Sequence, residues 1–197
     1  MMDSNFFALI SRMRYIARWG LMRNALPENI QEHSHMVAVL AHALGVIRRD
    51  IFGQPCDVNA LATAALYHDA SEILTGDLPT PIKYHNAEIM SAYHAVEDLA
   101  VQKLLGMLPP ELRATYAAVL DEDKGGDIYP LVKAADKLSA YIKCIEERKA
   151  GNNEFLSAEA QTRAALEASP LPEVQYFLEH FIPAFERDLD ELGAIGQ

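Results

Sequence analysis

Two histidines and two aspartates occur where helical spacing turns them toward the core, together with one glutamate. His33 precedes two apolar positions of its predicted helix by four and seven residues, so it shares their inward face. His68 follows apolar residues by three and seven, Asp69 is its neighbour, and Glu72 lies one turn beyond. Asp136 stands beside the apolar face of a later predicted helix. Buried imidazoles and carboxylates are costly unless they are paired or bind a cation, so binding one divalent ion would offset that cost.

Such an ion could carry out hydrolytic chemistry. The carboxylates would offset its charge, and the imidazoles would add affinity for a first-row transition metal. The ion lowers the pKa of bound water and stabilises negative charge on a phosphoryl oxygen. A single inward histidine is more often a hydrogen-bonded core residue than a ligand, so the interpretation depends on the combination. The remaining histidines are interpreted as surface or packing residues: His35, His42, His85, His94 and His180.

Composition restricts the class of protein. The chain has 197 residues, with 17 basic and 28 acidic side chains and a net charge of −11. An acidic surface repels a phosphate backbone, so a nucleic-acid polymer is not expected as a partner. The sequence holds no HExxH, P-loop or GxGxxG pattern, and no signature of a serine or cysteine nucleophile.

Membrane and export signals are also not expected. The longest apolar stretch, residues 36–47, is interrupted by His42 and is too short to cross a bilayer. The first ten residues lack a basic region typical of a secretory signal. Cys56 and Cys144 are far apart and do not form a CxxC pair, which suits a reducing compartment. The sequence therefore predicts a cytoplasmic protein without a membrane partner.

Helical periodicity dominates the elements that must position these residues. Apolar stripes predict helices over residues 6–16, 30–52, 58–75, 86–108, 111–120, 131–150 and 174–192, with a shorter one after Ser157. Asn29 with Glu32 forms a predicted capping box, and Asp57 and Asn86 are further N-caps. Pro183 should kink or divide the last helix.

Two segments between these helices are predicted as loops. Residues 76–81 hold a glycine and two prolines within six positions, and residues 121–127 are acidic with two glycines. No run of alternating β-branched residues is present. We therefore expect an all-α fold of roughly seven to nine helices in a single domain over residues 1–197. Its motif-bearing core spans about residues 6–150, with C-terminal helices over 151–197.

The order of the motifs resembles a known family. Glu-His-Ser at 32–34, Tyr-His-Asp-Ala-Ser-Glu at 67–72, Thr-Gly-Asp-Leu-Pro-Thr-Pro at 75–81 and Lys-Ala-Ala-Asp-Lys at 133–137 follow one another on a helical chain. This set resembles the HD-domain superfamily of metal-dependent phosphohydrolases. The Gly-Asp-Leu-Pro-Thr-Pro loop and the Arg18-Trp19 pair make the chain similar to the bacterial 5′-deoxynucleotidases.

The resemblance implies a metal site and a reaction. It implies that His33, His68, Asp69 and Asp136 bind one divalent ion: cobalt, manganese or copper. It implies hydrolysis of deoxyribonucleoside 5′-monophosphates to a deoxynucleoside and phosphate. The matching Glu72 is implied to be essential, and its role as acid or base stays open. The family is homodimeric, so a homodimer is expected.

The resemblance also implies a nucleotide site. Arg18 would orient the phosphate, since its planar guanidinium suits that group, and Trp19 would crowd the 2′ position of the sugar. Asp77 would act at the substrate and in catalysis. Asp69 and Asp136 would also contact substrate, and the remaining wall of the site would be formed by Leu78, Pro79 and Thr80.

Two alternatives remain open at the level of sequence. One is an HD-type hydrolase of nucleoside triphosphates or of another small phosphoester. Such relatives usually carry more basic residues, whereas this chain offers only Arg18, Arg23 and Lys83 near its motifs. The other is a catalytically silent HD module that binds a nucleotide, which the retained Glu72 argues against.

Overall fold

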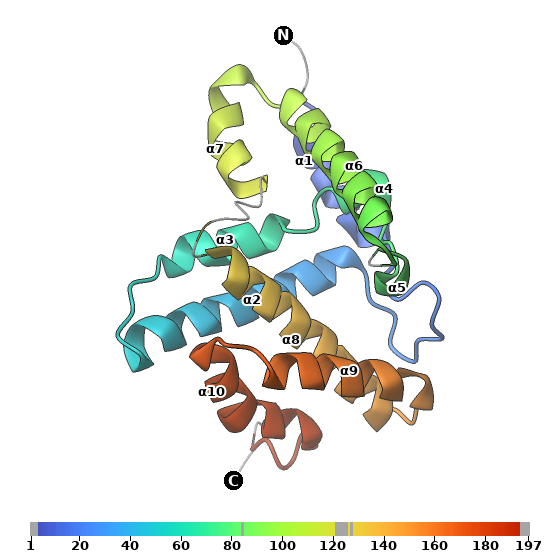
Figure 1. Ribbon diagram of the computed structural model, residues 1–197, viewed down its shortest axis with the longest axis vertical. Coiled ribbons are helices and arrows are strands. Elements are labelled where there is room, and N and C mark those ends of the chain that lie inside the picture. Colours follow the sequence, from blue (N-terminus) through green and yellow to red (C-terminus); the bar gives the residue numbers. More distant parts are fainter. Residues whose placement is uncertain (1–3, 84, 121–125, 127, 194–197) are drawn as a thin grey trace.

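The regular structure of the chain is helical (Figure 1). A computed structural model describes residues 4–83, 85–120, 126 and 128–193. Within that part of the chain, the β-type pairing is limited to one isolated antiparallel bridge between Ala17 and Asn29. The prediction of an all-α fold is therefore confirmed. No helix in the described ranges has both the length and the apolar character to span a bilayer.

The helices follow one another with short connections. Their bounds are α1 (Phe6–Ile10), α2 (Ile30–Val46), α3 (Val58–Tyr67), α4 (Glu72–Thr75), α5 (Thr80–Lys83), α6 (Ala87–Gly106), α7 (Pro110–Leu120), α8 (Ile128–Lys149), α9 (Leu156–Glu167) and α10 (Pro172–His180). Turns of 3₁₀-helix cover Ser11–Tyr15, Asn153–Phe155 and Ile182–Glu186, and α2 continues as a π-helix over Ile47–Ile51.

The centre of the fold is the packing of α2 against α3 and α8. Apolar residues of these helices and of α9 and α10 form one buried cluster, which includes Val37, Leu40, Leu44, Leu61, Leu131, Leu138, Ile145, Leu166, Val174 and Phe177. A Cβ atom at Gly45 would lie 3.0 Å from the Leu61 side chain. Glycine at this position therefore lets α3 lie directly against α2.

A second buried cluster joins α1, α6 and α7 at the opposite end of the molecule from α9 and α10 (Figure 1). Its members are Phe6, Ala70, Leu104, Leu105, Leu108 and Leu120. Ala70 belongs to the turn between α3 and α4, which carries His68 and Asp69. This cluster therefore packs against the turn that presents two of the candidate ligands.

The predicted helix over 58–75 is interrupted at the candidate ligands, and the prediction of a continuous helix was wrong there. α3 ends at Tyr67 and α4 begins at Glu72. Between them the chain forms tight turns, in which the Ala70 N–H donates to the Tyr67 carbonyl at 2.9 Å and the Glu72 N–H donates to the Asp69 carbonyl at 3.0 Å. Neighbours on a straight helix point about 100° apart, whereas this turn brings the side chains of His68 and Asp69 together.

Other boundaries differ for local reasons. The first helix tightens into 3₁₀ geometry after Ile10. The short helix predicted after Ser157 is α9, which begins at Leu156, and Asn152 caps the 3₁₀ turn that leads into it. The last helix divides before Pro183 as predicted, but its apolar pattern does not continue as helix through Leu192, which is half exposed.

The two predicted loops have different outcomes. The predicted loop 76–81 is shorter than expected, since α5 begins at Thr80. The other predicted loop, 121–127, lies outside the described residues except for Gly126.

Candidate metal and nucleotide site

Four predicted ligands converge from three separate segments. His33 lies on α2, His68 and Asp69 on the turn after α3, and Asp136 on α8. The His33 Nε2 atom lies 3.1 Å from Asp136 Oδ1 and 3.5 Å from Asp69 Oδ2, and the His68 Nε2 atom lies 3.1 Å from Asp69 Oδ2. One ligand atom each of His33, His68 and Asp136 lies within 4.8 Å of the others. His33, His68 and Asp136 are therefore close enough to share one ion, and Asp69 lies against both histidines.

The backbone and neighbouring side chains fix both imidazoles. The Asn29–Glu32 capping box sets the start of α2, so that His33 falls on its buried face. His33 Nδ1 hydrogen-bonds Ser139 Oγ at 3.1 Å, and His68 Nδ1 donates to the Ala65 carbonyl at 2.8 Å. Each Nδ1 atom is thus held by a hydrogen bond, and each Nε2 atom lies beside the aspartate carboxylates.

Both Nε2 atoms are buried without a well-aligned hydrogen bond among the described residues. A buried polar atom left without a partner is unfavourable. Ring nitrogens oriented by a hydrogen bond on the opposite side, with carboxylates beside them, form a donor set that fits a transition-metal ion. The cluster can therefore hold a metal ion.

The electrostatics of the cluster follow from burial and opposite charges. Burial alone would raise the pKa of Asp69, but His68 and His33 lower it well below its usual range. The pKa of Asp136 is lowered in the same way, against burial, by its contact with His33. Burial would lower the pKa of His68, but Asp69 raises it. The carboxylates are therefore held ionised and attract positive charge to this point.

Glu72 opens α4 next to this cluster. It is buried, and its Oε2 atom has no hydrogen-bond partner among the described residues. Burial, followed by the negative charges of Asp69 and Asp77, raises the pKa of Glu72 to about 10. A carboxyl group in this setting is suited to holding and giving up a proton.

The segment after α4 turns back toward the cluster. Gly76 has φ +74°, a conformation that favours glycine, and it ends α4 so that Asp77 follows directly. Burial raises the pKa of Asp77, while the Arg18 cation opposes that change. Leu78 and Pro79 are partly buried here, and the side chain of Thr80 lies outside the described part of the structure.

Arg18 and Trp19 lie in the segment between the first 3₁₀ turn and α2. Burial would lower the pKa of Arg18, but Glu28, Asp136, Asp69 and Asp77 raise it, in that order. The positive charge of Arg18 therefore interacts with the carboxylates of the candidate metal site. The Arg18 side chain pairs with Glu28 at 2.8 Å. The structure thus brings Arg18 to the predicted cluster.

Two supporting residues were not predicted from the sequence. Ser139, which orients His33, follows Asp136 by three positions on α8, and this helical spacing could have identified it. Glu28 contacts both Arg18 and Trp19, and no local pattern points to it. His94, interpreted as a surface or packing residue, hydrogen-bonds Glu97 at 2.9 Å.

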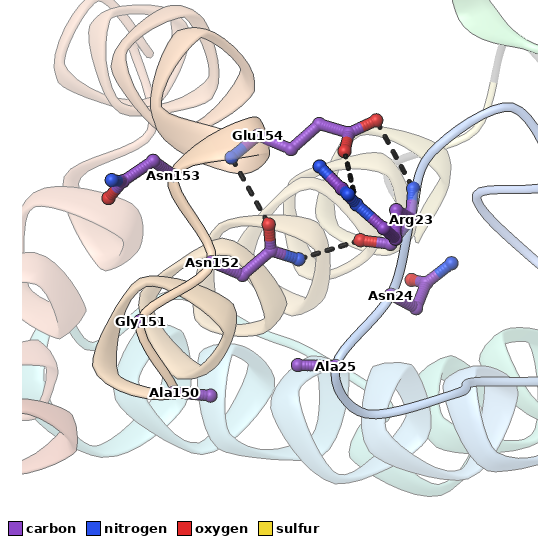
Figure 2. Close-up of a pocket in the computed structure, with 8 residues that line it drawn as sticks. All are labelled: Arg23, Asn24, Ala25, Ala150, Gly151, Asn152, Asn153 and Glu154. Carbon is purple, nitrogen blue, oxygen red and sulfur yellow. Dashed lines mark hydrogen bonds and ion pairs between the residues drawn. The ribbon is translucent and has the colours of Figure 1, made fainter.

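A separate surface pocket of about 490 Å³ lies between residues 23–25 and 150–154 (Figure 2). Arg23 and Glu154 pair across it, with 3.4 Å between Arg23 Nε and Glu154 Oε2. The Asn152 amide donates to the Arg23 carbonyl at 2.7 Å. The pocket shares no residue with the ligand cluster, and its contacts tie the segment after Trp19 to the turn that follows α8.

Comparison with known sequences gives full-length matches. Residues 5–185 match the family described as 5′-deoxynucleotidase YfbR-like. Proteins called 5′-deoxynucleotidase YfbR from Shigella boydii and Escherichia coli are each 51% identical over 194 residues, which is 98% of either chain.

Comparison with solved structures gives the same architecture. An HD-domain phosphohydrolase from Listeria innocua superposes with a TM-score of 0.81 at 24% identity, covering 94% of this chain and 90% of that one. The HD phosphohydrolase DatZ of cyanophage S-2L has a TM-score of 0.60 at 26% identity, covering 93% and 96%. That viral protein was solved with dA and one catalytic Zn²⁺ ion.

Proposed function

This chain belongs to the YfbR-like family of 5′-deoxynucleotidases, and from that premise we propose which of its residues bind the metal and the nucleotide and which move protons. Its reaction is the hydrolysis of a deoxyribonucleoside 5′-monophosphate to a deoxynucleoside and inorganic phosphate. The observation that carries the assignment of residues is that ligand atoms of His33, His68 and Asp136 lie within 4.8 Å of one another, with Asp69 against both histidines.

These four side chains are the proposed metal ligands. Two ring nitrogens and two carboxylates favour a first-row transition ion, and cobalt, manganese and copper are the proposed candidates. When bound, a divalent ion supplies an acidified water and stabilises negative charge on a phosphoryl oxygen. Ser139 and the Ala65 carbonyl keep the two imidazoles in position for this task.

The nucleotide is proposed to bind between three segments. Arg18 directs a planar pair of N–H donors at the phosphate, and the neighbouring carboxylates keep it cationic although it is buried. Trp19 lies against the sugar, where its bulk opposes a 2′-hydroxyl. Asp69 and Asp136 also contact the phosphate region. Asp77 acts at the substrate, with a wall formed by Leu78, Pro79 and Thr80.

Glu72 is proposed to protonate the leaving oxygen. A water attacks phosphorus, the bond from phosphorus to the 5′ oxygen breaks, and that oxygen takes a proton to become the 5′-hydroxyl. Burial and two neighbouring carboxylates favour the protonated form of Glu72. A protonated carboxyl group can donate at this step, whereas a carboxylate cannot.

Substrate and metal dependence test this assignment. Purified protein stripped with EDTA should release no phosphate from dAMP, and adding back cobalt or manganese should restore release. With metal present, dAMP should be hydrolysed faster than AMP and dATP, with metal content measured by elemental analysis. A protein that binds metal but releases phosphate from none of the three would contradict the proposed assignment and favour a silent nucleotide-binding module.

Trp19 provides a test of sugar selection. Replacing Trp19 with Ala should reduce the ratio of kcat/KM for dAMP over AMP by about tenfold or more, because the steric barrier to the 2′-hydroxyl is removed. Tyr15→Ala is a matched control, since Tyr15 is an exposed aromatic residue four positions earlier. An unchanged ratio in Trp19→Ala would refute the assigned contact.

The cellular setting and assembly are further proposals. Free Cys56 and Cys144 suit a reducing cytoplasm, and the net charge of −11 disfavours nucleic-acid polymers as partners. A homodimer is proposed, with exposed apolar side chains such as Val96 and Leu99 on α6 available to form an interface. We also treat residues 1–197 as one domain, because α2 and α8 contact both the N-terminal and the C-terminal helices.

A further inference from the structure

We propose that Glu28 is a positioning residue that holds Arg18 and Trp19 together and thereby sets the preference for a deoxyribose. This inference rests on the proposed roles of Arg18 and Trp19 at the phosphate and the sugar. Glu28 itself is not proposed to touch the substrate.

One carboxylate oxygen of Glu28 serves both side chains. Glu28 Oε2 accepts a hydrogen bond from Arg18 Nη1 at 2.8 Å and another from Trp19 Nε1 at 3.1 Å. The Arg18 and Glu28 side chains are 13% and 15% exposed, so solvent competes little for these bonds. Hydrogen bonds to an ionised acceptor are roughly twice as strong as neutral ones. The carboxylate therefore couples the position of the guanidinium to that of the indole.

The backbone places Glu28 directly beside Arg18. The isolated bridge pairs Ala17 with Asn29, and the Arg18 N–H donates to the Glu28 carbonyl at 3.0 Å. The Ile30 N–H donates to the Ile16 carbonyl at 3.0 Å on the other side of the bridge. The two ends of this loop are thus fastened together just before α2, and the side-chain pair forms on a fixed base.

Trp19 is held in an uncommon conformation. Its φ is +59°, which is unfavourable for a bulky side chain and persists only where surrounding contacts impose it. Its ring lies 5.2 Å from the buried Phe155 ring, between centroids. A ring contact limits tilting but has little directionality within the plane, whereas the bond from Nε1 to Glu28 is directional. Glu28 therefore fixes which edge of the indole faces the site.

The rest of the loop has its own supports. The N–H groups of Ala25 and Leu26 donate to Glu147 at 2.8 and 3.0 Å. The Arg23 N–H donates to Glu154 at 3.2 Å, as Figure 2 shows. Because these bonds do not involve Glu28, a substitution at Glu28 should leave the loop attached to α8. Glu154 offers a matched control, because it is an acidic residue that holds the same loop through Arg23 and, among the described residues, forms no hydrogen bond or ion pair with Trp19.

The experiment compares Glu28→Gln and Glu28→Ala with Glu154→Gln. In both Glu28 variants, the ratio of kcat/KM for dAMP over AMP should fall by about tenfold, which is the usual effect of a steric contact that excludes one small substrate group. Glu154→Gln should keep the wild-type ratio. Combining Glu28→Gln with Trp19→Ala should lower the ratio no further than Trp19→Ala alone, because both changes act through the same indole.

A second readout does not depend on activity. Trp19 is the single tryptophan of the chain, so intrinsic fluorescence reports its surroundings alone. Both Glu28 variants should show emission at longer wavelength and stronger acrylamide quenching, with metal content equal to the wild type. Glu28→Gln keeps the shape of the side chain, so the fluorescence comparison can be made on this variant if Glu28→Ala does not fold.

Two results would overturn the proposal. One is unchanged tryptophan fluorescence in Glu28→Gln. The other is an equal loss of activity on both sugars, with the dAMP to AMP ratio preserved. If the wild type released no phosphate while the fluorescence still changed, the proposed residue roles would fail, and with them the specificity role. The positioning of Trp19 by Glu28 would stand.

Discussion

Replacing Asp136 by asparagine is expected to abolish metal retention and phosphate release together. Asparagine keeps the shape of the side chain but removes the negative charge that lies 3.1 Å from His33 Nε2. Losing a partner that merely orients a ligand costs roughly 10- to 100-fold in metal affinity or activity, and loss of a charged ligand should cost more. Elemental analysis and phosphate release from dAMP, measured on the same preparation, check this result.

Glu72→Gln is the matched control for that loss. Glu72 is buried near the same cluster but is proposed to move a proton rather than to bind metal. This variant should retain metal and the thermal stabilisation that metal gives, while kcat falls by about 10²- to 10⁴-fold, the usual contribution of a proton-transfer group. Full metal content and full activity in Asp136→Asn would refute its ligand role, and loss of metal in Glu72→Gln would place Glu72 among the ligands.

Glu147→Ala is expected to lower the free energy of unfolding more than any other substitution considered above. The Glu147 carboxylate is fully buried and accepts hydrogen bonds from Ala25, Leu26, Asn152 and Lys143. Removing it leaves the buried Lys143 ammonium without its carboxylate. Breaking a buried ion pair in this way costs about 3–5 kcal/mol, which urea unfolding would measure.

The pH dependence of that loss has a defined sign. Burial would raise the pKa of Glu147, but Lys143 and the N–H groups of Leu26 and Ala25 lower it from 4.5 to about 2. A depressed pKa in the folded state stabilises the fold above the unfolded value of 4.5, and this stabilisation is lost as the pH falls toward 2. The difference in unfolding free energy between wild type and Glu147→Ala should therefore shrink across this interval.

Glu154→Ala is the control for burial. Glu154 lies seven residues later and pairs with Arg23, whose side chain is 88% exposed. An exposed pair contributes about 0–1 kcal/mol, so this variant should unfold almost as the wild type does. A loss in Glu147→Ala no larger than in Glu154→Ala would show that the buried network does not stabilise the fold.

Local signals accounted for most of the helices. Asn29, Asp57 and Asn86 were predicted as caps, and in the structure each accepts hydrogen bonds from the first turn of its helix. These predictions succeeded because a cap depends on residues two or three positions away. The break at His68 and Asp69 was not predicted, because the apolar spacing continues across it. In the structure, Ala70 in this break belongs to the buried cluster with residues of α1 and α6.

The residues that support the site could not be predicted from the sequence, because they contact it across long distances along the chain. The side-chain types of the site indicated that four ligands could meet, but not what supports them. Glu147 meets Ala25 across 122 positions, and Ser139 meets His33 across 106. Nothing in the sequence near Glu28 distinguishes it from other acidic residues, since the bridge between Ala17 and Asn29 places it beside its partners.

α8 carries Asp136, Ser139, Lys143 and Glu147 on successive turns of one helix. A candidate metal ligand, the support of His33 and the anchor of the loop that holds Arg18 therefore belong to a single continuous element. Any fluctuation that frays its central turns would disable all three at once, so partially active, locally melted forms should be rare. Enzymatic activity and far-ultraviolet circular dichroism should then decline along one shared curve on heating.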